Sequence, residues 1–232
     1  AGNRVGEVAS VSFRVQLLRG NDVYEAGSPG VPYLRVTDSP YVANSGLFTF
    51  AGIKVGGQTG QDFRLKIEST NLATTLSATT SVFRLSNDEA SEMVLTRDIV
   101  ANAGDIASAT RAAFTSQPQL KLYDSFSNLV ENDSSTRIIA VLNGGGGAQL
   151  VGQRVAIARS GIVTFQNLGV RGPLTQSYSI TFREASDEEY RTFVLDDSSS
   201  GSPALTPQTI TNPTSTVFTL NPGPASYFEL SV

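Results

Sequence analysis

Short runs of alternating apolar and polar side chains recur along the chain. The clearest run places Phe63, Leu65 and Ile67 on one side and Arg64 and Lys66 on the other. Because successive side chains of a strand point to opposite faces of a sheet, this alternation predicts a strand with one buried face. Similar runs are found at 8–18, 33–36, 82–85, 120–122, 136–142, 178–182 and 216–220. The pattern therefore predicts an all-β chain.

The segments between these runs are rich in residues that interrupt regular structure. Residues 24–41 contain five glycines and prolines, which predicts a long irregular excursion with one short strand at 33–36. Residues 99–114 are rich in alanine. Gly104 interrupts them and no apolar stripe with helical spacing develops, so a helix is the less favoured interpretation there.

One stretch of sequence occurs twice. Residues 45–50 read Ser-Gly-Leu-Phe-Thr-Phe, and residues 160–165 read Ser-Gly-Ile-Val-Thr-Phe, 115 residues later. The correspondence continues without a gap as far as Ile67, which matches Phe182. A period of this size corresponds to one small domain, so the chain is predicted to contain tandem copies of a fold.

A second match has a larger offset. Residues 81–85 match residues 216–220, 135 residues later, and the same offset relates Ala90-Ser91 to Ala225-Ser226. The longer offset indicates an insertion near 183–215. The later part of this stretch is rich in Ser, Gly, Thr and Pro. The chain is therefore predicted to reach the first strand of a third copy and to be a piece of something longer.

Composition narrows the chemistry. The net charge is −4 and charged residues make up 16% of the chain, with no basic run that could neutralise phosphates, so nucleic acid is not expected as a partner. The chain has no cysteine and no histidine, which removes thiolate chemistry and most ordinary hydrolase and transition-metal chemistry. No carboxylate pair of a glycosidase is identifiable, so the chain is not expected to be an enzyme, and no apolar run is long enough to span a membrane.

The order of motifs in the second copy resembles a known family. An Ala-Ser-x-x-Val-Leu stretch begins at Ala90, and Ala103-Gly104 and Gln117-Pro118 follow. An Asp-x-x-x-Asn turn, the Ser-Gly-Ile-Val-Thr-Phe motif and a Tyr-x-Ile-x-Phe strand complete the order. This order resembles the tandem immunoglobulin-like repeats of very large extracellular surface and filament proteins, including invasin-like bacterial adhesins.

The resemblance implies two tandem immunoglobulin-like antiparallel β-sandwiches, each of about 7–9 strands with Greek-key connections. The expected domains are residues 1–87, which lack part of the pattern at their N-terminal side, residues 88–220 with the insertion, and residues 221–232 as the start of the next repeat. The predicted core residues are Phe48, Phe50, Phe63, Leu65 and Ile67 in the first repeat and Val163, Phe165, Tyr178, Ile180 and Phe182 in the second.

Oxygen-bearing side chains gather in two places. Asp124, Asn128 and Asp133 are candidate calcium ligands at a junction between domains, the only cofactor considered. A turn capped by these side chains is the favoured alternative, because the regular carboxylate spacing of an EF-hand loop is absent. The acidic residues between 187 and 197 are expected in a solvated loop.

Four further features carry a functional and a structural interpretation. Asn132-Asp133-Ser134 is a sequon, so Asn132 is a candidate glycosylation site. Lys66 and Lys121 are candidates for an isopeptide crosslink, although strand alternation points them outward. Tyr178 is a candidate for the tyrosine-corner hydrogen bond, with plain core packing preferred because its counterpart is Phe63. The glycine run 144–147 lacks the lysine and helix of a phosphate-binding loop.

The expected function is structural. The repeat and the missing catalytic residue types indicate a segment of a long extracellular or cell-surface stalk or fibre protein, whose partners are neighbouring repeats of the same protein in a homopolymer or filament. The alternative is an adhesin or carbohydrate-binding module. The absence of tryptophan counts against sugar stacking, although Tyr24, Tyr33 and Tyr41 remain as aromatic surfaces.

Overall fold

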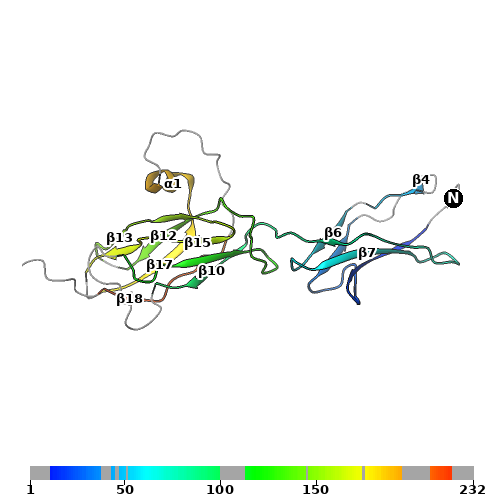
Figure 1. Cartoon of the computed structure of the whole chain (residues 1–232), viewed down its shortest axis with the longest axis horizontal. Coiled ribbons are helices and arrows are strands. Elements are labelled where there is room, and N and C mark those ends of the chain that lie inside the picture. The colour runs from blue at the N-terminus through cyan, green and yellow to red at the C-terminus, as the bar shows by residue number, and fades with distance from the viewer. Residues whose placement is uncertain are drawn as a thin grey trace, which may run out of the picture. The chain divides into compact units, whose positions relative to one another are not determined.

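The chain forms two compact units, unit 1 (Ala1–Asn87) and unit 2 (Asp88–Val232), and the regular structure of their described residues is predominantly antiparallel β (Figure 1). The computed structural model describes residues 11–37, 43–44, 47–50, 52–99, 113–144, 146–173, 176–194 and 210–220. Most of the alanine-rich stretch 99–114, the acidic residues Asp196 and Asp197, and residues 221–232 lie outside these ranges. The all-β prediction is confirmed at the level of predominantly β structure in several antiparallel sheets.

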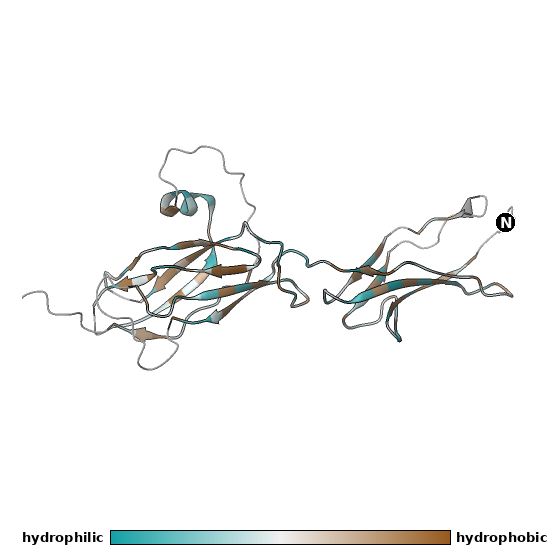
Figure 2. Ribbon diagram, viewed as in Figure 1, coloured by the Kyte–Doolittle hydropathy of each residue, from teal (hydrophilic) through white to brown (hydrophobic). Residues whose placement is uncertain are grey.

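Unit 1 is organised around its longest strand, β7, whose ribbon alternates between apolar and polar residues (Figure 2). Strands β1 and β8 flank β7 in the order β2-β1-β7-β8, and β9 pairs with the beginning of β7. Two smaller pairs, β3 with β6 and β4 with β5, are also found among the described residues of this unit. The strands are β1 (Phe13–Arg19), β2 (Asp22–Glu25), β3 (Tyr33–Val36), β4 (Ala43–Asn44), β5 (Leu47–Phe48), β6 (Ile53–Gly56), β7 (Asp62–Ser69), β8 (Ser77–Thr79) and β9 (Phe83–Arg84).

The described residues of unit 2 form two larger sheets, a small strand pair and a helix. One sheet has the order β10-β11-β15, the other has the order β14-β12-β17-β18, and β13 pairs with β16. The elements are β10 (Glu92–Arg97), β11 (Gln119–Tyr123), β12 (Arg137–Asn143), β13 (Gln149–Val151), β14 (Val155–Ile157), β15 (Ile162–Thr164), β16 (Gly169–Arg171), β17 (Ser177–Glu184), α1 (Asp187–Val194) and β18 (Phe218–Thr219).

The predicted core positions of the two units are not equally buried. In unit 2, Val163, Phe165, Tyr178, Ile180 and Phe182 are each at most 1% exposed and belong to one large apolar cluster. Of the five predicted core positions in unit 1, only Phe63 reaches that degree of burial. Phe48, Phe50, Leu65 and Ile67 are half-buried. Equal apolarity in the sequence therefore does not give equal burial.

Strand pairing relates the two units by the same offsets as the sequence. Phe63 pairs with Phe83 between β7 and β9, and their counterparts Tyr178 and Phe218 pair between β17 and β18. A side-chain hydrogen bond is also repeated. The Leu65 amide donates to Thr80 Oγ1 at 3.0 Å, and the Ile180 amide donates to Ser215 Oγ at 2.9 Å.

The Ser-Gly pair of the second motif copy forms a tight turn. Ser160 has φ 50° and Gly161 has φ 71°. Residues other than glycine rarely adopt this left-handed backbone region. A Cβ atom at Gly161 would also lie 2.7 Å from the carbonyl oxygen of Val130. The motif is therefore a turn followed by a strand, β15, whose residue Val163 is completely buried.

The prediction of a solvated acidic loop is wrong for its first part, because residues 187–194 form helix α1. Ser186 precedes the helix and Glu189 follows three residues later. The Glu189 amide donates to Ser186 Oγ at 3.2 Å, and the Ser186 amide donates to Glu189 Oε2 at 3.0 Å. This reciprocal arrangement is a capping box, which satisfies amide groups that a helix start leaves unpaired. The Ser-x-x-Glu spacing was the signal in the sequence.

Candidate functional site

The turn after β11 is built around the carboxylate of Asp124, which is 2% exposed. Its Oδ1 accepts from the amides of Phe126 and Asn128, each at 2.9 Å. Its Oδ2 accepts from Asn128 Nδ2 at 2.9 Å and from the Asp88 amide at 3.1 Å. Both oxygens are therefore occupied by donors from the protein, as in a side-chain-capped turn.

These hydrogen bonds explain the electrostatics of the carboxylate. Burial raises the pKa of Asp124, but hydrogen bonds from the side chain and amide of Asn128 and from the amides of Asp88 and Phe126 outweigh burial. The pKa of Asp124 is consequently held below its ordinary value. The anionic form is thus stabilised by N–H donors of the fold.

Asp133, the third calcium candidate, caps the next turn. Its Oδ1 accepts from the amides of Ser135 and Thr136, each at 2.9 Å, and its Oδ2 accepts from Thr136 Oγ1 at 2.6 Å. Within the described part of the chain, no group of three or more acidic residues is arranged to hold a metal ion. The capped-turn interpretation therefore accounts for each contact that these two carboxylates make.

The side chain of Asn132 is on the surface, next to this turn. An exposed asparagine in a Ser/Thr sequon has the access that a glycosyl transfer needs. Asn132 remains a predicted glycosylation site.

The helix α1 is attached to the sheet β14-β12-β17 by arginines that the sequence did not single out (Figure 1). Arg183 of β17 binds the carboxylate of Glu189 through both of its terminal nitrogens. Arg137 of β12 donates to Asp187 Oδ1 at 2.9 Å, with its guanidinium carbon 3.8 Å from the centre of the Tyr190 ring. Two ion pairs and a cation–π contact therefore hold this helix.

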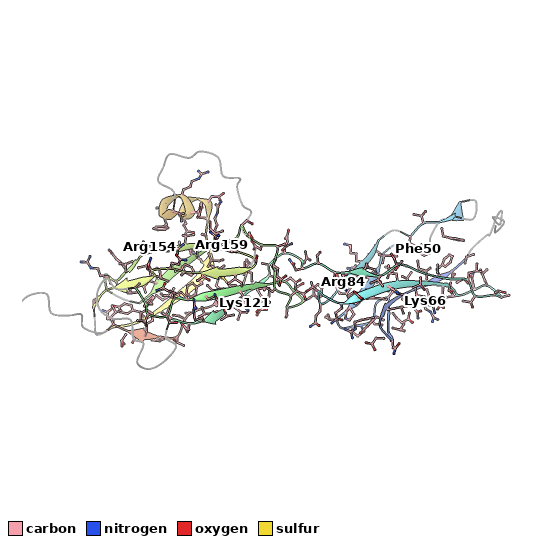
Figure 3. The ribbon with its side chains drawn as sticks, viewed as in Figure 1. Phe50, Lys66, Arg84, Lys121, Arg154 and Arg159 are labelled. Carbon is pink, nitrogen blue, oxygen red and sulfur yellow. The ribbon has the colours of Figure 1, made fainter. Side chains whose placement is uncertain are left out.

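Apolar contacts continue the attachment. The buried residues Ile139, Val155 and Ala185 form a small cluster with Val141, and Tyr190 of α1 packs against it. Arg154, which lies on the side of unit 2 that carries α1 (Figure 3), has its guanidinium carbon 5.1 Å from the centre of the Phe193 ring. The helix therefore packs locally on the face of this sheet that carries Ile139 and Val155.

The ion pair between Arg183 and Glu189 depends on the protonation state of the Glu189 carboxyl. The hydrogen bonds from Arg183 lower the pKa of Glu189 to about 2, with burial opposing the shift and Ser186 adding to it. Glu189 also pairs reciprocally with Ser186. A single carboxylate thus joins the helix start to the sheet.

Tyr178 combines the two roles considered for it. Its ring is completely buried, 6.0 Å from the Phe218 ring, and its hydroxyl donates to the carbonyl oxygen of Pro173 at 2.8 Å. The hydrogen bond thus reaches back five residues from the beginning of β17. This is the geometry of a tyrosine corner.

The two candidate crosslinking lysines are not in buried sites (Figure 3). Lys66 Nζ lies 2.6 Å from Glu68 Oε1, and its side chain is 35% exposed. Lys121 of β11 is half-buried. An isopeptide bond needs a lysine that is desolvated beside a carboxylate, and neither residue has that environment.

In the described residues, no helix is long and apolar enough to cross a membrane.

Comparison with known proteins adds little. No protein-family model matches the sequence, and no curated protein matches it either. Among solved structures, the chain is similar to a β-glucuronidase of Parabacteroides merdae at 13% identity (74% of this chain, 19% of that chain, TM-score 0.29). A second structure of that enzyme matches at 11% identity (89% and 21%, TM-score 0.32). A β-glycosidase from Bacteroides vulgatus matches at 10% identity (92% and 23%, TM-score 0.33). The chain spans about a fifth of the length of these proteins, and at such TM-scores the likeness carries no argument.

Proposed function

We propose that this chain is a structural repeat segment of a long extracellular surface, stalk or fibre-forming protein, made of tandem immunoglobulin-like sandwiches. The observation that carries the proposal is the repetition itself. The pairing of Phe63 with Phe83 and of Tyr178 with Phe218 follows the two sequence offsets, which supports the interpretation of the two units as copies of one fold. Stacked copies of one domain are the means by which repeat proteins gain length.

The topology of unit 2 supports the immunoglobulin-like class. Its sheet β10-β11-β15 matches the A-B-E sheet of such a sandwich, and β14-β12-β17-β18 matches a C′-C-F-G sheet. The tyrosine-corner hydrogen bond of Tyr178 lies at the start of β17, the strand that corresponds to F.

The contacts of the candidate sites support a structural role as well. The carboxylates of Asp124 and Asp133 accept hydrogen bonds from the turns they cap, and the charged residues of α1 bind arginines of the neighbouring sheet. Each of these groups stabilises the fold by satisfying its neighbours. We place the chain outside the cell or on its surface, as the family resemblance implies.

Small-angle X-ray scattering on tandem fusions tests this function. One, two and three copies of the chain joined end to end should give maximum dimensions that rise by a constant increment per copy. A stalk gains length in proportion to the number of repeats, whereas a compact body grows much more slowly with chain length. Growth at the rate of a compact body would contradict the proposal.

A further inference from the structure

Strand β12 ends in an asparagine that is followed directly by a glycine. Asn143 is the last residue of β12, it is exposed, and Asn143-Gly144 is the only Asn-Gly pair of the sequence. Asparagine is chemically labile because the amide nitrogen of the next residue can attack its side-chain carbonyl carbon. This attack is least hindered when the next residue is glycine, which has no Cβ atom. The position therefore combines exposure with the dipeptide that favours the reaction.

The packing of unit 2 requires this glycine. Gly144 has φ 140°, a backbone conformation that residues with a side chain rarely adopt. A Cβ atom at Gly144 would lie 2.6 Å from Cδ1 of the Tyr178 ring and 2.9 Å from the carbonyl oxygen of Ser177. A larger residue would therefore clash with the buried tyrosine of β17, so the fold itself places a glycine after Asn143.

The nitrogen that follows Asn143 belongs to an exposed residue. In the described part of the chain, no hydrogen bond engages the Gly144 amide. Asn167 gives a contrast, because it is also exposed but precedes Leu168, whose amide donates to Gln117 Oε1 at 2.9 Å. The nitrogen after Asn167 is thus both shielded by a branched side chain and occupied by a hydrogen bond.

The side chain of Asn143 connects β12 to β17. Asn143 pairs with Ser179 in the sheet, and its Nδ2 donates to Thr181 Oγ1 at 2.8 Å and to Ser179 Oγ at 3.3 Å. These hydrogen bonds hold the carboxamide in place and slow the attack by the Gly144 nitrogen. They also depend on Nδ2, so they are lost when this atom leaves.

We propose that Asn143-Gly144 is a site of spontaneous covalent modification in this protein. The deprotonated amide nitrogen of Gly144 attacks Cγ of Asn143, a carbon–nitrogen bond forms, and Nδ2 takes up a proton and leaves as ammonia. Water then opens the resulting succinimide ring. Cleavage between Cγ and the nitrogen gives aspartate, and cleavage between the main-chain carbonyl carbon and the nitrogen gives isoaspartate.

The products weaken the end of the β12–β17 pair to different degrees. Both exchange the Nδ2 donor for a carboxylate, which can only accept hydrogen bonds from Ser179 and Thr181. Isoaspartate also adds one carbon atom to the main chain before Gly144, which displaces this residue from its close approach to the Tyr178 ring. The modification therefore destabilises unit 2 at this strand end, and it is independent of the proposed stalk function.

Peptide mapping by mass spectrometry, on the full chain incubated in mildly alkaline buffer, tests the proposal. Asn143 should be converted to aspartate and isoaspartate about tenfold or more faster than Asn167 in the same molecule, because glycine removes the steric hindrance that leucine imposes. Asn143→Gln is the matched control. It retains a carboxamide but would have to form a larger ring, so residue 143 should stay unmodified over the same time.

A second pair of variants tests the restraint on the carboxamide. Thr181→Val removes the nearer acceptor of Nδ2 and should accelerate the conversion about twofold or more, the effect of losing one hydrogen bond. Thr164→Val is the control, because Thr164 Oγ1 accepts from Gln119 Nε2 at 3.2 Å in the other sheet, and its rate should equal that of the wild type. If circular dichroism shows that Thr181→Val is unfolded, the wild-type chain in urea replaces it and should also react faster than the folded chain.

Amide hydrogen exchange then measures the consequence. Ion exchange separates the modified chains by their added negative charge, and exchange of residues 140–143 and 177–181 should be faster in them than in the unmodified protein. Asn143→Asp carries the carboxylate without the additional main-chain atom, so its exchange should increase less.

Three outcomes would overturn the proposal. One is conversion of Asn143 that is no faster than that of Asn167. Another is an equal rate in Thr181→Val and Thr164→Val, or in the folded and urea-unfolded wild type where that comparison is used, which would remove the role assigned to the Asn143 hydrogen bonds. The third is a set of modified chains whose amide exchange matches that of the unmodified protein.

Discussion

The hydroxyl of Tyr178 donates a hydrogen bond to the carbonyl oxygen of Pro173, five residues earlier, at 2.8 Å. The ring of the same residue is completely buried in the largest apolar cluster of the chain. A buried tyrosine whose hydroxyl finds a backbone acceptor secures the chain segment that leads into its strand. In unit 1 the counterpart is Phe63, which is equally buried without a hydroxyl. At these equivalent positions, unit 2 therefore makes a side-chain hydrogen bond that a phenylalanine in unit 1 cannot make.

Removing only this hydroxyl should destabilise unit 2. Tyr178→Phe is expected to lower the free energy of unfolding by about 1 kcal/mol, the usual net worth of one intramolecular hydrogen bond. Urea denaturation followed by circular dichroism measures the change. Tyr24→Phe is the control, because the Tyr24 hydroxyl makes an exposed contact with Asp22 at 3.4 Å. A Tyr178→Phe variant as stable as the wild type would show that ring packing alone matters.

The difference in burial between the repeats should appear in a matched pair of truncations. Phe165 is completely buried, with its ring 5.3 Å from Phe182, so Phe165→Ala is expected to cost about 3–5 kcal/mol. Its counterpart Phe50 is half-buried, so Phe50→Ala should cost about 1–2 kcal/mol. Denaturation of each full-length variant gives both values. Equal costs would mean that the two positions are not structurally equivalent.

Acid should loosen the helix α1. The hydrogen bonds from Arg183 depress the pKa of Glu189 from 4.5 to about 2 in the folded protein. A carboxyl with a depressed folded-state pKa contributes stability that is complete above pH 4.5 and is lost as the pH falls towards 2. Amide hydrogen exchange of residues 190–194, corrected for the intrinsic effect of pH, should therefore become faster across this window.

Two variants separate this ion pair from general acid effects. Glu189→Gln should show fast exchange in the helix at neutral pH and little further change in acid, because the titrating group is gone. Glu188→Gln should retain the response, since Glu188 makes no ion pair with Arg183 in the described contacts. Identical pH responses in the two variants would contradict the assignment.

The turn after β11 should depend on its carboxylate and not on calcium. Asp124→Ala leaves the amides of Asp88, Phe126 and Asn128 without their acceptor, so a loss of about 1–3 kcal/mol in the free energy of unfolding is expected. Adding calcium or a chelator to the wild-type chain should leave its unfolding temperature unchanged. A calcium-dependent rise would restore Asp124, Asn128 and Asp133 as metal ligands, because a ligand that binds the folded state stabilises it.

A further measurement concerns the helix attachment at Arg137. This arginine is 9% exposed, and its pair with Asp187 is largely shielded from water. Asp187→Ala should lower the stability of unit 2 by about 1–3 kcal/mol, since a shielded charge then loses an anionic partner. Asp22→Ala is the control, because the pair of Asp22 with Arg19 is on the surface and is expected to contribute less than about 1 kcal/mol.

Sequence alone determined the features that depend on local periodicity. Alternation of apolar and polar residues predicted strands such as 63–67 and 178–182, because side chains of a strand alternate between faces whatever surrounds them. The repeat offsets likewise identified equivalent residues in the two units. The structure pairs them in the same way, Phe63 with Phe83 and Tyr178 with Phe218. The sequence also contains the Ser-x-x-Glu capping box that begins α1. The acidic composition of the stretch favoured a solvated loop instead.

Only the tertiary structure decided what each of these elements touches. The Asp88 amide reaches the Asp124 carboxylate from 36 residues away, and Asp187 meets Arg137 from 50 residues away, distances in sequence that no local pattern records. The same holds for burial. Ile67 and Phe182 occupy equivalent positions and are both apolar, yet only Phe182 is enclosed. Burial is a property of the strands that cover a face, and those strands are present in one copy and not among the described residues of the other.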